Sequence, residues 1–183
     1  MPQISKKIKS LPWDEVESAI RKEIEWLKNT ILPSPFEKGF CDECIYRQIA
    51  TLILQGLIKI KNITSENDSL WIKSASRLKK SHGNEWHSEM MNVIAGHFEE
   101  LGCEIVVEPN LSNGRADLGI YCEKESPLYV EVGTVSLPKL LVNLKTMGGS
   151  VFLVVPHADH VIEFSVIEAD VKSKLFHSDP DKK

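Results

Sequence analysis

Two carboxylates stand inside apolar segments of this chain, at Asp117 and Glu131. They belong to GRADLGI (114–120) and LYVEVGT (128–134), which are both typical of strands. A charge in an apolar strand is unfavourable by several kcal/mol unless it is paired or binds a cation. Two such carboxylates on neighbouring strands can share one divalent metal ion, for which oxygen ligands are suited. The structural alternative is that Asp117 caps a turn and Glu131 pairs with a lysine.

The segments around these carboxylates predict a mixed sheet flanked by helices, in the order α-β-β-β-α-β. A helix must end before Gly102, and the apolar run at 151–155 is typical of a strand buried on both faces. The predicted helices are 85–101 and 137–145, and the predicted strands are 103–108, 116–121, 128–132 and 151–155, with one more short strand at 161–167.

This order, with the Asp of RADL and the Glu of VEVG, resembles the PD-(D/E)XK nuclease superfamily over about residues 85–156. That superfamily includes many restriction enzymes and the archaeal Holliday-junction resolvases. The resemblance implies a restriction-endonuclease-like fold and a metal-dependent endonuclease that hydrolyses phosphodiester bonds in DNA. It also implies that Asp117 and Glu131 bind Mg²⁺ or Mn²⁺. Enzymes of this family are often dimers, so a homodimer is compatible with the resemblance.

The family lysine, two residues after the glutamate, is replaced here by Gly133. Some members supply this lysine from a neighbouring helix, and Lys139 stands near the start of the helix after the third strand. Lys139 would orient the attacking water or offset developing negative charge. The alternative is a solvated surface lysine. The glycine also supports a different function, a non-catalytic DNA-binding or assembly protein on a degenerate nuclease fold.

An acidic residue on the first helix is a further family feature, yet helical periodicity places His87 at that inward position. His87, Met90, Met91, Ile94, Phe98 and Leu101 form the predicted inward stripe, while Glu85 and Glu89 point away. His87 is therefore a candidate catalytic residue, or else a hydrogen-bonded core histidine. Glu89 and Glu108 are candidate second-layer acids near the metal.

The first half of the chain predicts helices at 13–29 and 42–55, then strands at 57–61 and 70–73. This order resembles a winged helix-turn-helix over about residues 11–75. We therefore expect a DNA- or partner-binding domain at 1–75, a linker at 76–84 and the nuclease-like domain at 85–183. The resemblance implies DNA contacts, and packing or dimerisation is the alternative. The basic side chains placed for DNA contact are Arg47, Lys59, Lys61 and Lys73.

Composition fits this division, because residues 1–80 carry a net charge of +4 and residues 81–183 a net charge of −8. No apolar run is long enough to span a membrane, so we expect a cytoplasmic protein. The four cysteines are too few for a secreted disulfide scaffold. Cys41 and Cys44 have zinc-like spacing without a second pair, which favours free thiols. The segment VPHADH (155–160) is a metal-site candidate, with a polar turn as the alternative.

Overall fold

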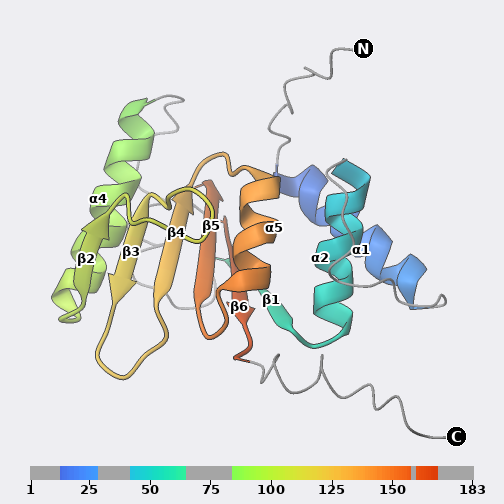
Figure 1. The fold of residues 1–183 in the computed structure, drawn as a ribbon. Helices are drawn as coiled ribbons and strands as arrows, with labels where there is room; N and C mark the ends of the chain where they lie inside the picture. The colour runs from blue at the N-terminus through green and yellow to red at the C-terminus, as the bar shows by residue number, and fades with distance from the viewer. Residues whose placement is uncertain (1–12, 29–41, 65–83, 158–159, 169–183) are drawn as a thin grey trace, which may run out of the picture.

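A six-stranded mixed sheet forms the centre of the protein, which confirms the predicted α+β class (Figure 1). The computed structural model describes residues 13–28, 42–64, 84–157 and 160–168. The strand order is β1-β6-β5-β4-β3-β2. In chain order the elements are α1 Trp13–Leu27, α2 Asp42–Leu54, β1 Ile58–Thr64, α4 Asn84–Glu100, β2 Glu104–Val107, β3 Leu118–Tyr121, β4 Leu128–Val132, α5 Leu137–Thr146, β5 Val151–His157 and β6 His160–Val166.

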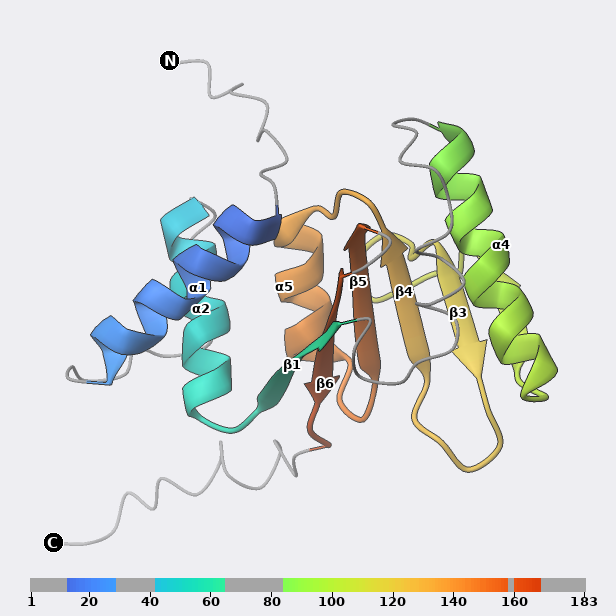
Figure 2. The ribbon, with the colours of Figure 1, turned by 180° about the vertical axis from the view of Figure 1, so that it is seen from behind.

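Strands β2, β3 and β4 form an antiparallel meander, and α5 then crosses over so that β5 runs parallel to β4. Side chains alternate across β4, because successive residues of a strand point to opposite faces. Val130 and Val132 pack with Met90 of α4. Tyr129 packs with Leu140 of α5 on the other face. Helix α4 therefore covers one face of the sheet, while α1, α2 and α5 cover the other (Figure 2).

Strand β1 belongs to this same sheet, which corrects the expected division into two domains. Its seven residues pair antiparallel with β6, from Ile58 opposite Val166 to Thr64 opposite His160. Helices α1 and α2 share one buried core with α5 and β5. Residues 13–64 therefore complete the central sheet, and the boundary expected at 76–84 separates no cores among the described residues. The predicted return strand at 70–73 lies outside the described residues.

The cysteines also differ from expectation, because all those in the described residues are disulfide-bonded. A disulfide joins Cys103 to Cys122, one step beyond the partners Glu104 and Tyr121 at the end of the β2–β3 ladder. Cys44 is disulfide-bonded as well, so the expected free thiols are not found in the described part of the chain. Disulfides are uncommon in cytosolic proteins, so this pairing does not favour the expected cytoplasmic location.

One position of the predicted α4 stripe was wrong. Met90 and Ile94 are buried and Glu85 and Glu89 exposed, as expected, but Leu101 is 64% exposed. The helix ends at Glu100, so Leu101 lies outside the helical stripe, and Gly102, with a φ of +80°, turns the chain directly after it. Among the described residues, no helix combines the length and apolarity needed to cross a membrane.

Candidate metal centre

Asp117 is hydrogen-bonded to the two residues of β4 that flank Glu131. Its backbone N–H donates to the Val130 carbonyl at 3.0 Å. Its carboxylate Oδ2 accepts a hydrogen bond from the Val132 N–H at 2.6 Å. Val130 and Val132 flank Glu131, so these two bonds hold Asp117 next to the end of β4 that carries Glu131. Asp117 lies directly before β3, and its carboxylate also contacts His87 of α4.

Glu131 is the buried member of this pair, with 5% of its surface exposed. Burial raises the pKa of Glu131, because a low-dielectric environment disfavours the charged form. The ammonium of Lys139 lowers the pKa, while the negative charge of Asp117 raises it further. The two negative charges therefore repel each other. A cation between them would relieve both their repulsion and the cost of burial.

Lys139 reaches this pair from the first turn of α5. Its Nζ lies 2.6 Å from Glu131 Oε1 and also donates to the Arg115 carbonyl at 2.6 Å. The Lys139 ammonium therefore lies against the Glu131 carboxylate. Helix α5 starts at this point because Ser136 is extended and Pro138 follows within its first two positions, where proline is tolerated.

The backbone conformation of Gly133 favours glycine at this position. Its φ is +81°, a backbone conformation that favours glycine. A Cβ added there would meet Trp86 of α4 at 3.8 Å, with no contact to Lys139. The backbone therefore explains why no lysine occupies position 133.

His87 approaches the centre from α4, with its Nε2 3.3 Å from Asp117 Oδ2. It is therefore placed to hold the Asp117 carboxylate, as the predicted inward position requires. The two further acids do not join the centre. Glu89 is exposed, and Glu108 is paired with Arg115 at 2.9 Å on the surface. Neither fits the role of a second-layer acid beside the carboxylates.

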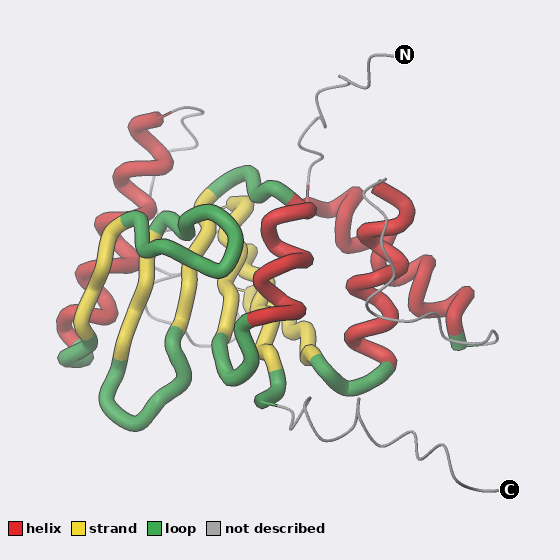
Figure 3. The backbone as a smooth tube through the Cα atoms, viewed as in Figure 1, coloured by secondary structure: helices red, strands yellow, loops and turns green. Residues whose placement is uncertain are grey.

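The loop between β2 and β3 completes the centre, and sequence reasoning missed how it is held. This loop reaches across the sheet toward α5 (Figure 3). Asn143 of α5 is 1% exposed, and its side chain accepts from the Asn113 N–H at 2.8 Å and donates to the Asn113 carbonyl at 3.0 Å. Asn143 and Lys139 lie one turn apart on α5, so they dock the loop together. The sequence signal for this contact is a pair of polar residues, Lys139 and Asn143, which lie four positions apart on one face of a predicted helix.

The donor set suits a hard divalent cation that keeps several waters. Within the described ranges, no group of three or more His, Cys, Asp or Glu side chains could hold a metal ion. A cation here would therefore rest on the Asp117 and Glu131 carboxylates, and Mg²⁺ is commonly bound through one or two carboxylates plus water. The described part of the chain offers Asp117 Oδ1 no hydrogen-bond donor, which leaves this oxygen available to a cation.

The basic residues predicted to contact DNA differ in their surroundings. Arg47 is engaged within the protein, where its Nε donates to Glu23 at 2.9 Å and its guanidinium lies 4.9 Å from the Trp26 ring centre. This pairing ties α2 to α1 and leaves the Arg47 side chain 41% exposed. Lys59 and Lys61 are exposed on β1, and Lys73 lies outside the described residues.

Comparison with known proteins yields no match to this chain among family models, curated proteins or solved structures. The function must therefore be argued from the element order and from the side chains that meet where β3 begins and β4 ends.

Proposed function

We propose that this protein is a divalent-metal-dependent nuclease that hydrolyses phosphodiester bonds in DNA. The single observation that carries the proposal is that the Asp117 carboxylate is hydrogen-bonded to β4 next to Glu131, whose own carboxylate pairs with the Lys139 ammonium. The elements from α4 to β5 also follow the α-β-β-β-α-β order of the PD-(D/E)XK superfamily, which this half of the chain resembles. Asp117 directly precedes the second strand of that order, and Glu131 lies on the third.

In this proposal Asp117 and Glu131 hold Mg²⁺ or Mn²⁺. When bound, such an ion polarises a phosphate oxygen and lowers the pKa of a water. Lys139 places a positive charge where negative charge develops on the phosphate during hydrolysis. His87 fixes the orientation of the Asp117 carboxylate, and Asn143 fixes the loop whose carbonyl anchors Lys139.

A second function is favoured by one feature of the same centre. Lys139 forms an ion pair with Glu131, so the buried carboxylate is already compensated without a metal ion. A chain in which this pair is purely structural would be a non-catalytic DNA-binding or assembly protein on a degenerate nuclease fold.

Cleavage of supercoiled, linear and single-stranded DNA in millimolar Mg²⁺ or Mn²⁺ separates the two functions. The nuclease predicts cleavage that EDTA abolishes, and Asp117→Asn or Glu131→Gln should lower its rate on the order of 100-fold or more. Glu108→Gln is the matched control, since Glu108 is an exposed carboxylate on the β2–β3 loop and, among the described residues, pairs only with Arg115. Absence of cleavage on every DNA form, with DNA binding retained, would establish the non-catalytic alternative.

A further inference from the structure

Arg115 places an exposed positive charge on the β2–β3 loop, and the proposed function uses only its backbone carbonyl. Its side chain is 63% exposed, whereas the next residue, Ala116, is buried in the core. Asp117 follows two residues after Arg115, so their Cα atoms are at most roughly 7 Å apart. The guanidinium is therefore carried on the solvent side of the loop, close to a proposed metal ligand.

The backbone of Arg115 is fixed by the loop around it. Arg115 forms an antiparallel bridge with Asn110, and the Ala116 N–H donates to the Pro109 carbonyl at 3.2 Å. The Arg115 carbonyl also accepts a hydrogen bond from Lys139 at 2.6 Å. Only the side chain of Arg115 remains to be ordered when a ligand binds, which lowers the entropic cost of binding.

The guanidinium of Arg115 has a partner that a phosphate can replace. Its Nη1 donates to Glu108 Oε2 at 2.9 Å, and both side chains are exposed. Ion pairs at such exposed positions contribute little to stability. A guanidinium has five N–H donors, and among the described residues that of Arg115 pairs only with Glu108. Most of its donors therefore face solvent.

The charge of the surrounding centre gives this cation a function. Asp117 and Glu131 repel a phosphate, and the Lys139 ammonium is already engaged with Glu131. The half of the chain from residue 81 onward carries a net charge of −8. A polyanion that approaches the centre is therefore repelled unless positive groups lie at the surface beside it. Arg115 is such a group, and its planar fork matches two phosphate oxygens.

We propose that the Arg115 guanidinium binds a backbone phosphate of DNA, one or two nucleotides from the phosphate that is hydrolysed. Phosphates of one strand follow each other at about 3.4 Å along the helix axis, so this spacing agrees with the short separation of Arg115 and Asp117. The phosphate replaces Glu108 as the acceptor. A contact of this kind fixes the register of the strand without reading its sequence. The inference rests on the proposed function, because it takes DNA as the ligand.

The test measures DNA binding by the full chain in EDTA, where the proposed nuclease cannot cleave. Fluorescence anisotropy with two labelled duplexes of unrelated sequence, at about 50 to 200 mM NaCl, gives the affinity and its salt dependence. Arg115→Gln should weaken binding about tenfold, and equally for both duplexes. It should also lower the slope of log affinity against log salt by about 0.9, the value for one lost phosphate contact.

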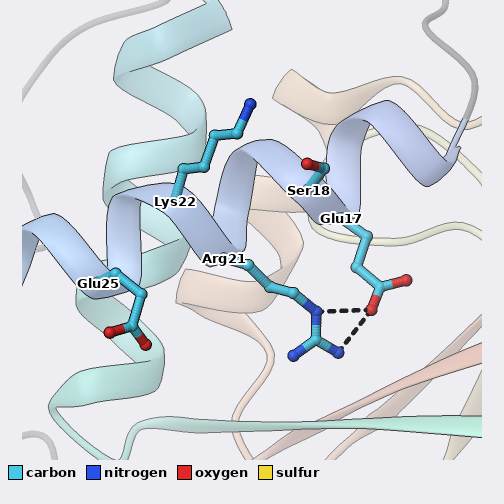
Figure 4. Close-up of a pocket in the computed structure, with 5 residues that line it drawn as sticks. All are labelled: Glu17, Ser18, Arg21, Lys22 and Glu25. Atoms are coloured by element: carbon cyan, nitrogen blue, oxygen red, sulfur yellow. Dashed lines mark hydrogen bonds and ion pairs between the residues drawn. The ribbon is translucent and has the colours of Figure 1, made fainter.

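Arg21→Gln is the matched control, because it also removes one charge from an exposed arginine that pairs with a glutamate. Arg21 is 67% exposed and pairs with Glu17 at 2.6 Å on α1 (Figure 4). Glu17 accepts a hydrogen bond from Asn62 of β1, and β1 lies four strand spacings from β3, roughly 19 Å. Arg21→Gln should therefore leave the affinity and the slope nearly unchanged. Arg115→Lys should restore the slope but only part of the affinity, since an ammonium lacks the planar fork.

Equal losses of affinity from Arg115→Gln and Arg21→Gln would overturn the proposal. A loss that differs between the two duplexes would also overturn it, as would a chain that binds neither duplex or an Arg115→Lys slope equal to that of Arg115→Gln. A chain that cleaves no DNA, yet loses affinity on Arg115→Gln as expected, would contradict the nuclease alone. The phosphate contact would then belong to a non-catalytic DNA-binding protein.

Discussion

Gly114 lies directly against the side chain of Lys139. A Cβ at position 114 would stand 2.9 Å from Lys139 Cδ and 3.4 Å from its Cγ. The φ of Gly114 is +77°, so the backbone as well as the space favours glycine. The β2–β3 loop therefore forms a close-fitting surface that directs the lysine toward Glu131.

Substituting Gly114→Ala should displace Lys139 and lower the cleavage rate. The left-handed backbone alone makes alanine unfavourable by about 1–2 kcal/mol, and the contact with Lys139 Cδ adds to that. Gly96→Ala is the matched control, because Gly96 lies within α4 with nothing near its added Cβ. That control should retain cleavage and gain up to about 1 kcal/mol of stability from helix propensity. Similar cleavage rates for both variants would show that the close contact is not needed.

Lys139→Ala should lose most of the cleavage rate, on the order of 100-fold, while Mn²⁺ binding and folding persist. Such a pattern is expected of a group whose interaction is made mainly in the transition state. Lys145→Ala should behave in the opposite way. Lys145 donates to the buried Gln48 side chain between α5 and α2, so its loss should lower stability by about 1 kcal/mol and spare cleavage. Equal and mild effects of both substitutions on cleavage would show that Lys139 does not replace the family lysine, and would favour the non-catalytic DNA-binding function.

The stability of Glu131→Gln relative to the unsubstituted protein should rise with pH. Burial raises the pKa of Glu131 above its ordinary value of 4.5, so the folded protein holds this proton more tightly than the unfolded chain. The resulting stabilisation is fully present below 4.5 and is lost as the pH rises through the raised pKa. Glutamine cannot ionise, so the stability of the Glu131→Gln protein does not fall with pH for this reason.

Urea unfolding without divalent metal, at a series of pH values from about 4.5 to 8, measures the difference in free energy of unfolding between the two proteins. The exposed Glu104→Gln on β2 controls for removal of a negative charge. A difference that stays constant or shrinks with rising pH would contradict the prediction.

Removing the disulfide with Cys103→Ser and Cys122→Ser should lower the free energy of unfolding by about 3 kcal/mol, as expected for a loop of this length. The cross-link spans 19 residues that include all of β3 and the loop carrying Asn113. Thermal unfolding of both proteins under non-reducing conditions measures the effect. An unchanged Tm would mean that the bond contributes nothing to the folded state of this hairpin.

The sequence predicted local elements well and long-range pairing poorly. The strand expected at 128–132 has the observed bounds, because its alternating apolar residues serve both faces of the sheet. The prediction that the strand at 57–61 pairs with the next strand in the sequence did not rest on a pattern of this kind. The apolar residues Ile58 and Ile60 predict that this strand is buried, but they do not indicate which strand pairs with it. The partner is β6, which lies about a hundred residues later in the chain. The disulfide depends on the same kind of register information, since Cys103 and Cys122 become neighbours only when β2 pairs with β3.

The centre was predictable where chemistry constrained single residues. A carboxylate in an apolar strand demands compensation, which identified Asp117 and Glu131, and the lysine missing at 133 directed attention to Lys139. The contributions of Gly114 and Asn143 depend instead on how a loop packs against a helix. Glycine and asparagine are both common in turns and on surfaces, so neither residue type indicates a contact between a loop and a helix.

The pairing of β1 with β6 also has a consequence during synthesis. Partners such as Ile58 and Val166 are separated by roughly a hundred residues, which at typical elongation rates takes on the order of 5–20 s to translate. Throughout that interval β1 and the apolar sides of α1 and α2 emerge from the ribosome before β6 exists. The nascent chain thus presents an unpaired strand that chaperones can recognise, and the β1–β6 pairing forms only after β6 has been synthesised.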